Sequence, residues 1–131
     1  MPVVDASVLV AATADDGPEG AWAERVLAGG NLIAPHLVLA EAANVLRRLE
    51  RAKLLSRLEA TAAHADLIRL DLKLVPYEPF AERTWELRAN LSSYDAWYVA
   101  VAELADMPLA TLDRRLTRAT GPDCEFLLPP S

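Results

Sequence analysis

The sequence predicts an α/β protein with a three-layer α/β/α architecture around a central, mostly parallel sheet of four to five strands. Two observations predict this class. Short apolar stretches rich in β-forming residues alternate with longer stretches whose apolar residues recur at helical spacing, and prolines and glycines separate the two kinds of segment. Strands that alternate with helices usually form parallel sheets covered on both faces. A chain of 131 residues, 53% of them hydrophobic, is expected to form one domain over residues 1–131.

The first half of the chain is expected to hold two strands and four helices. Gly29-Gly30 stops the second helix, Pro35 ends the second strand, and Ser56 is a typical helix N-cap. The third helix shows the clearest apolar periodicity of this half. The expected elements are, in order, a strand over 2–4, helices over 6–14 and 19–28, a strand over 32–34, and helices over 37–53 and 56–69.

The second half is expected to hold three strands and three helices. Pro76 ends the third strand, and Pro79 occupies the first turn of a helix, where proline is tolerated. Ser92 or Ser93 caps the following helix. The expected elements are a strand over 72–75, helices over 79–91 and 93–105, a strand over 109–112, a short helix over 113–119, and an edge strand over 125–128.

Composition excludes several classes of protein. The single cysteine, Cys124, cannot form an internal disulfide or a cysteine-rich zinc site. No apolar run approaches the roughly 20 residues that span a bilayer, and no basic leader precedes the first strand, so we expect a cytoplasmic protein without a membrane partner. The net charge of −6 argues mildly against nucleic acid. Arginines nevertheless cluster at 47–51 and 114–118, either as solvated helix faces or as phosphate contacts.

Four acidic residues are expected to meet at one edge of the sheet. Asp5 and Asp113 directly follow the first and fourth strands, and Glu41 lies in the opening turns of the helix after the second strand. Asp95 lies in the first turn of a helix that runs antiparallel to the following strand, which returns its N-terminus to the same edge. In parallel sheets, sites form at the carboxyl ends of the strands.

Each acid also has a structural explanation. Asp5 and Asp113 could be helix N-caps, Asp95 has capping-box spacing from Ser92, and Glu41 could be an early-turn carboxylate favoured by the helix dipole. Crowded together, four carboxylates repel one another unless a cation neutralises them. An all-oxygen donor set favours Mg²⁺ or Mn²⁺.

The segments VVDASVLV, APHLVLAEAANVLRR, SSYDAWYVAVAELA and LATLD resemble the four acidic motifs of the PIN-domain ribonucleases, and most closely those of the VapC-type toxins of toxin–antitoxin pairs. The resemblance extends over nearly the whole chain. It implies that Asp5, Glu41, Asp95 and Asp113 line a pocket for one or two Mg²⁺ (or Mn²⁺) ions.

Three further polar residues are candidates for orienting these acids. Ser7 stands where the family has a small hydroxyl residue near the first acid, and Thr111 is similarly placed two residues before Asp113. Ser7 could also be an ordinary early-helix residue, and threonine also favours strands. Asn44 lies three residues after Glu41, on the same helix face, and could orient that carboxylate.

The resemblance implies a metal-dependent endoribonuclease in which water attacks in line and leaves a 5′-phosphate and a 3′-hydroxyl. It also implies a homodimer and a small VapB-type antitoxin, whose tail would lie in a groove near the active site, with helices 37–53 and 56–69 as plausible walls. The arginines nearest the acids are candidates for RNA contacts. They are Arg114, Arg115, Arg118 and Arg48. The alternative is a catalytically degenerate PIN scaffold that only binds RNA or a partner.

Overall fold

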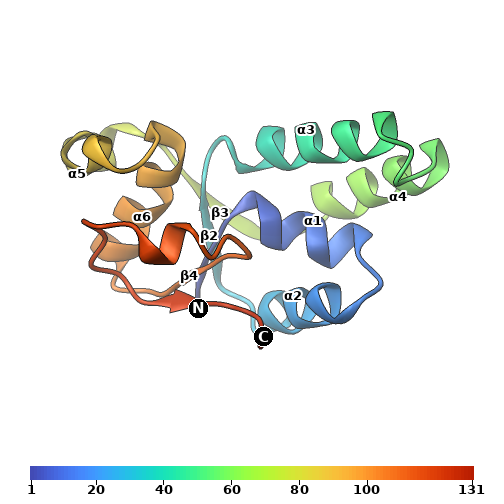
Figure 1. Cartoon of the computed structure of the whole chain (residues 1–131), viewed down its shortest axis with the longest axis horizontal. Coiled ribbons are helices and arrows are strands. Elements are labelled where there is room, and N and C mark those ends of the chain that lie inside the picture. The colour runs from blue at the N-terminus through green and yellow to red at the C-terminus, as the bar shows by residue number, and fades with distance from the viewer.

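The computed structural model describes residues 1–131 and has five strands and six α-helices in three layers (Figure 1). The strands are β1 (Val3–Val4), β2 (Leu32–Pro35), β3 (Leu72–Val75), β4 (Leu109–Ala110) and β5 (Phe126–Leu127). The helices are α1 (Ala6–Ala14), α2 (Pro18–Ala28), α3 (Val38–Arg51), α4 (Arg57–Ile68), α5 (Ala81–Glu86) and α6 (Ser93–Ala105). The predicted fold class is confirmed.

All strand pairs are parallel, and the sheet has the order β3-β2-β1-β4-β5. The chain winds outward from β1 through β2 to β3, then crosses to the other side of β1 and continues through β4 to β5. Such sheets bind ligands beyond the strand ends where the winding reverses. In this chain the reversal lies between the carboxyl ends of β1 and β4, which are followed by Asp5 and Asp113.

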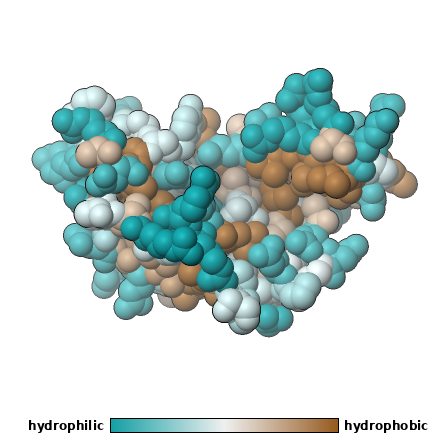
Figure 2. Space-filling view, in the orientation of Figure 1, coloured by the Kyte–Doolittle hydropathy of each residue, from teal (hydrophilic) through white to brown (hydrophobic).

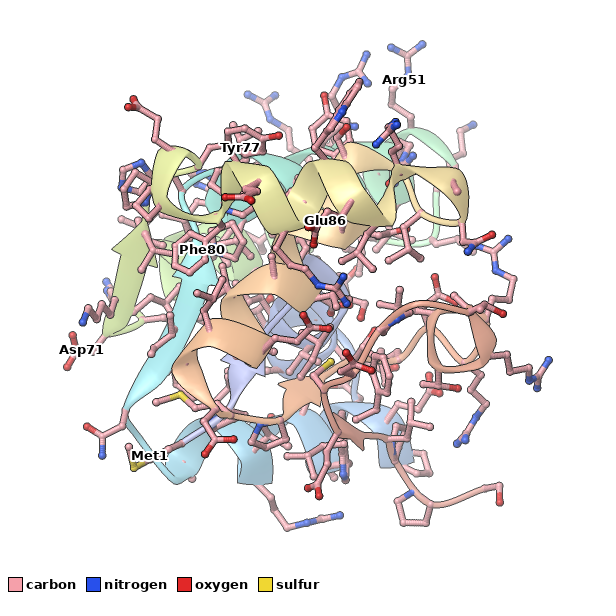
Figure 3. All side chains as sticks on the ribbon, turned by 90° about the vertical axis from the view of Figure 1, so that its left-hand side faces the viewer. Met1, Arg51, Asp71, Tyr77, Phe80 and Glu86 are labelled. Atoms are coloured by element: carbon pink, nitrogen blue, oxygen red, sulfur yellow. The ribbon has the colours of Figure 1, made fainter.

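Helices cover both faces of the sheet. Helices α5 and α6 lie on one face, and α1, α2, α3 and α4 lie on the other (Figure 1). Figure 3 shows the direction of the strands, since Asp71 precedes β3 at the lower end of the sheet and Tyr77 follows β3 at the upper end. None of the helices is both long and apolar enough to cross a membrane.

The core holds the first turns of α1 and α6 in place. Both residues of β1 are fully buried, as are Val8 and Leu9 of α1. In α6 every residue from 96 to 102 is buried, and three of these seven are alanines. Small side chains let a helix lie close to a sheet, so the acids at the beginnings of these helices stand on rigid supports.

The structure differs from the sequence prediction in three places. The helix predicted over 79–91 is interrupted. It consists of a 3₁₀ turn at Glu78–Phe80, then α5, then a second 3₁₀ turn at Leu87–Ala89. Pro79 has no N–H to donate, and Phe80 leaves the helical region with φ −110° and ψ 2°.

The other two differences lie around the fourth strand. The strand predicted over 109–112 is only two residues long: the backbone N–H of Thr111 still donates to Leu127 of β5, and the chain bends at Leu112. The helix predicted over 113–119 is a single 3₁₀ turn, Leu116–Arg118. Asp113 stays outside this turn, since its carboxylate accepts the backbone N–H of Arg115 in a local turn.

Candidate active site

The four predicted acids belong to one electrostatic cluster at the carboxyl edge of the sheet. Asp5 and Asp113 follow neighbouring parallel strands, and Glu41 and Asp95 lie in the first turns of α3 and α6. Burial raises the pKa of Glu41 and of Asp95, and neighbouring charges add to both shifts, those of Asp95 and Asp5 at Glu41 and that of Asp113 at Asp95. The four residues that the sequence singles out therefore lie at the same edge of the sheet, within electrostatic range of one another.

Asp5 is held by three hydrogen bonds. Its Oδ1 accepts the hydroxyl of Ser7 at 2.5 Å and the backbone N–H of Val8 at 3.2 Å. Its Oδ2 accepts the hydroxyl of Thr111 at 2.5 Å. The bond from Val8 makes Asp5 the N-cap of α1, so the structural explanation of this residue is correct and compatible with a role in the site.

The hydroxyls of Ser7 and Thr111 also hold the loop that follows β4. Ser7 Oγ accepts the backbone N–H of Leu112 at 3.1 Å, and Thr111 Oγ1 accepts the backbone N–H of Asp113 at 3.0 Å. Each hydroxyl thus donates to Asp5 and accepts from the segment that carries Asp113. These two residues fix the position of one acid relative to the other.

Glu41 has a partner that the sequence analysis missed. The hydroxyl of Tyr98, on α6, donates to Glu41 Oε1 at 2.6 Å. Burial and the neighbouring carboxylates raise the pKa of Tyr98 well above its ordinary value, so this hydroxyl remains a donor. The available signal was spacing, because Tyr98 lies one helical turn after Asp95 and therefore on the same face of α6.

The contacts of the Asp113 carboxylate are with the loop that follows it. Its Oδ1 accepts the backbone N–H of Arg115 at 3.0 Å and lies 3.5 Å from Arg115 Nε. The side chain of Arg115 is 90% exposed, so this ion pair is weak and the guanidinium is free to move.

Three of the four acids resist ionisation in the absence of a cation. Burial raises the pKa of Asp5, although the hydrogen bonds from Ser7, Thr111 and Val8 oppose this rise. Burial also raises the pKa of Glu41 and Asp95, and neighbouring carboxylates add to both shifts. Such a cluster is stabilised by a bound cation, which favours the charged forms.

The donor chemistry of the cluster fits a hard divalent cation, although no three His, Cys, Asp or Glu side chains lie close enough in this structure to hold a metal ion. All candidate ligands are carboxylate oxygens, as Mg²⁺ and Mn²⁺ prefer. Glu41 and Asp113 each use one oxygen for hydrogen bonds and leave the other unused. Asp5 accepts three bonds out of about four that a carboxylate can take, which leaves one position on Oδ2.

The remaining predicted residues lie around this cluster. Asn44 is exposed and makes no hydrogen bond to Glu41, so its role in orienting that acid stays a prediction. Arg114 donates to the carbonyl of Pro129 at 2.7 Å, which ties it to the C-terminal segment. Arg48 and Arg118 are exposed.

An apolar hollow adjoins the site on the side of α1 and α3. Ser7 and Leu112 line its inner end, Val45 and Leu49 of α3 form one wall, and α1 forms the other. Figure 2 shows apolar side chains gathered between these helices. Two helices were predicted as walls of a groove near the site. The first, α3, lines this hollow, whereas the second, α4, lines a separate and more polar hollow together with α3.

Comparisons with known proteins agree with this arrangement. The family model of the PIN domain matches residues 3–122. The VapC ribonuclease Mb0985 of Mycobacterium bovis is 40% identical over 130 residues, which are 99% of each chain. Among solved structures, the sarcin–ricin loop cleaving toxin VapC20 of Mycobacterium tuberculosis has a TM-score of 0.66 at 21% identity, covering 90% of this chain and 94% of that one. VapBC2 of Rickettsia felis, bound to a DNA fragment from its promoter, has a TM-score of 0.67 at 13% identity, covering 96% of each chain.

Proposed function

The chain belongs to the PIN-domain family as a ribonuclease of the VapC type, and we propose that it is an Mg²⁺- or Mn²⁺-dependent endoribonuclease that acts in the cytoplasm as the toxin of a toxin–antitoxin pair. Residues 1–131 would form a single nuclease domain. The observation that carries the proposal is the convergence of four acids at the point where the sheet reverses its winding, with Asp5 held by two hydroxyls.

Asp5, Glu41, Asp95 and Asp113 would hold one or two divalent ions. When bound, the metal would neutralise charge on the phosphate and make water a usable nucleophile at neutral pH. Ser7 and Thr111 keep the carboxylate of Asp5 fixed and fix the loop of Asp113 to it. In the proposed hydrolysis, water attacks phosphorus in line, the bond from phosphorus to the 3′ oxygen breaks, and the products carry a 5′-phosphate and a 3′-hydroxyl.

Arg115 and Arg118 are the proposed phosphate contacts, because both are exposed in the segment that follows Asp113 and Arg115 lies beside that acid. Arginine suits phosphate through its fixed fork of donors. Arg48 would contribute from α3. Arg114 is a weaker candidate, since its guanidinium already donates to Pro129.

We propose that a VapB-type antitoxin places an extended segment in the apolar hollow between α1 and α3. The hollow is lined mainly by apolar side chains and ends at Ser7 and Leu112, beside the acids. A basic side chain at the end of such a segment would reach the acidic cluster and oppose metal binding. The proposal that the antitoxin occupies this hollow is tested by substituting Val45→Asp, which should weaken inhibition without changing cleavage by the free toxin.

We also propose a homodimer. Tyr77, which follows β3, and Trp85, in α5, are 38% and 61% exposed. Figure 3 presents to the viewer the side on which Tyr77 lies. Exposed aromatic side chains of this kind are enriched at protein interfaces. Light scattering across a range of protein concentrations tests this proposal, and a monomer at every concentration would contradict it.

The activity is tested by incubating the purified chain with RNA and sequencing the ends of the products. With Mg²⁺ or Mn²⁺ we expect cleavage that leaves 5′-phosphate ends. In EDTA we expect no cleavage. Asp5→Asn should abolish cleavage while the protein stays folded. If the wild-type chain binds RNA without cleaving it, the result would support the alternative of a catalytically degenerate binding module. Full activity of Asp5→Asn, or of the wild type in EDTA, would refute the proposed mechanism.

A further inference from the structure

The hydrogen bond between Tyr98 and Glu41 joins two helices that come from distant parts of the chain. Tyr98 lies on α6 and Glu41 on α3, 57 residues apart, and their side-chain oxygens are 2.6 Å apart. It is the only hydrogen bond that the side chain of Glu41 makes. The position of this carboxylate is therefore determined by one donor.

That donor is itself held rigidly. The side chain of Tyr98 is only 3% exposed, and its neighbours along α6, from 96 to 102, are all buried. A ring packed in this way cannot follow a carboxylate that moves. Asp95 lies on the same face of the same helix, three residues earlier, so α6 carries both one acid of the cluster and the anchor of another.

We propose that Tyr98 is a positioning residue for the cleavage reaction: its hydroxyl holds Oε1 of Glu41 so that Oε2 stays available to a divalent cation. This inference rests on the proposed function. It explains why a tyrosine hydroxyl is placed in an otherwise apolar stretch of α6, where phenylalanine would fill the same space.

The test compares Tyr98→Phe with the wild-type chain, using Mn²⁺ as the probe. Removing the partner of a metal ligand typically lowers metal affinity by about 10- to 100-fold, so Mn²⁺ binding measured by calorimetry should weaken by at least about tenfold. The Mn²⁺ concentration that gives half-maximal RNA cleavage should rise by a similar factor, while the KM for RNA at saturating Mn²⁺ stays unchanged. Tyr94→Phe is the matched control, because Tyr94 lies on the same helix, is 56% exposed and has a hydroxyl that makes no hydrogen bond within the chain. It should leave Mn²⁺ binding unchanged.

A purely structural role is separated from positioning by the Glu41→Gln background. If Tyr98 acts through Glu41, Tyr98→Phe should change Mn²⁺ affinity less than about twofold once Glu41 has been replaced, because the interaction is already lost. Thermal unfolding checks that each variant is folded under the conditions of the titration.

Two outcomes would overturn the inference while the proposed function stands. These are wild-type Mn²⁺ affinity in Tyr98→Phe, and a full additional loss when Tyr98→Phe is combined with Glu41→Gln. A wild-type chain that neither binds Mn²⁺ nor cleaves RNA would instead overturn the proposed function, and this role of Tyr98 with it.

Discussion

Replacing Thr111 by valine should destabilise the protein mainly through the ionised form of Asp5. Thr111 is fully buried, and its hydroxyl donates to Asp5 Oδ2 at 2.5 Å and accepts the N–H of Asp113 at 3.0 Å. Valine fills the same space without the hydroxyl. A hydrogen bond to a charged group contributes about 1.5–3 kcal/mol, and the half-buried N–H that loses its acceptor adds roughly 1 kcal/mol. We therefore expect Thr111→Val to lower the free energy of unfolding by about 2–4 kcal/mol at pH 7.

Thr84→Val is the matched control for this substitution. Thr84 is also fully buried, and its hydroxyl donates to the carbonyl oxygen of Phe80 at 2.7 Å, an uncharged acceptor that is not part of the acidic cluster. Its loss should cost about 1 kcal/mol at every pH. Urea unfolding in EDTA measures both variants against the wild type, with linear extrapolation to water.

The dependence on pH identifies the source of the difference. The hydroxyl of Thr111 lowers the pKa of Asp5, whereas burial raises the pKa of this carboxyl above its ordinary value of 3.8. As the pH falls through the raised pKa of the folded state, Asp5 becomes neutral and the charged part of the lost hydrogen bond disappears. The cost of Thr111→Val should then approach that of Thr84→Val. Equal costs at pH 7, or a cost that does not fall at acidic pH, would show that Thr111 does not hold an ionised Asp5.

Three further predictions concern the acidic cluster, the ion pair between Arg83 and Glu103, and the arginines that follow Asp113. Three acids have a raised pKa in the folded chain, so the folded chain binds their protons more tightly than the unfolded chain does. The melting temperature in EDTA should therefore fall as the pH rises from about 4 through these raised pKa values. Mn²⁺ should reverse this fall, and a melting temperature that does not change with pH would contradict the prediction. Arg83 donates two hydrogen bonds to Glu103, at 2.6 and 3.2 Å, so Arg83→Met should lower the free energy of unfolding measured in urea by about 1–2 kcal/mol. Because neither residue belongs to the acidic cluster, the metal dependence of cleavage should not change. Arg115→Ala combined with Arg118→Ala should weaken RNA binding and reduce the slope of its salt dependence by about 1–2, and an unchanged slope would make both residues solvated surface.

The sequence predicts elements well where their signals are local. Helix α1 has the predicted bounds, Ala6–Ala14, because Asp5 caps it and the turn at 15–17 ends it. Ser56 begins α4 with a complete capping box, in which its hydroxyl and Glu59 exchange hydrogen bonds with the backbone. The prediction of one helix over 79–91 was wrong, because a helical pattern of apolar residues does not distinguish a continuous helix from short helical turns joined at Phe80.

The acids of the site were predictable, and most of their partners were not. Their placement follows from topology, because any residue directly after a parallel strand reaches the same edge of the sheet. Ser7 and Thr111 were placed by resemblance, but their double role, donating to Asp5 and accepting from the loop of Asp113, depends on a contact across more than 100 residues. Tyr98 was missed for the same reason: its spacing from Asp95 places it on the face of α6 that carries an acid, but nothing in the local sequence identifies Glu41, 57 residues away, as its partner.

The capping bond of Asp5 decides which substitution isolates its charge. Asparagine is as good an N-cap as aspartate, so Asp5→Asn can keep an oxygen on the N–H of Val8 and the hydroxyl of Ser7. Its amide can donate to the hydroxyl of Thr111, which then accepts instead of donating. Asp5→Asn therefore removes a negative charge that burial disfavours and keeps most of the hydrogen bonds. In EDTA at pH 7 it should be at least as stable as the wild type. Asp5→Ala, in contrast, loses the cap and both hydroxyl contacts and should be less stable by about 1 kcal/mol or more. If both variants lose cleavage but only Asp5→Ala loses stability, the missing activity belongs to the carboxylate charge and not to the helix that it caps.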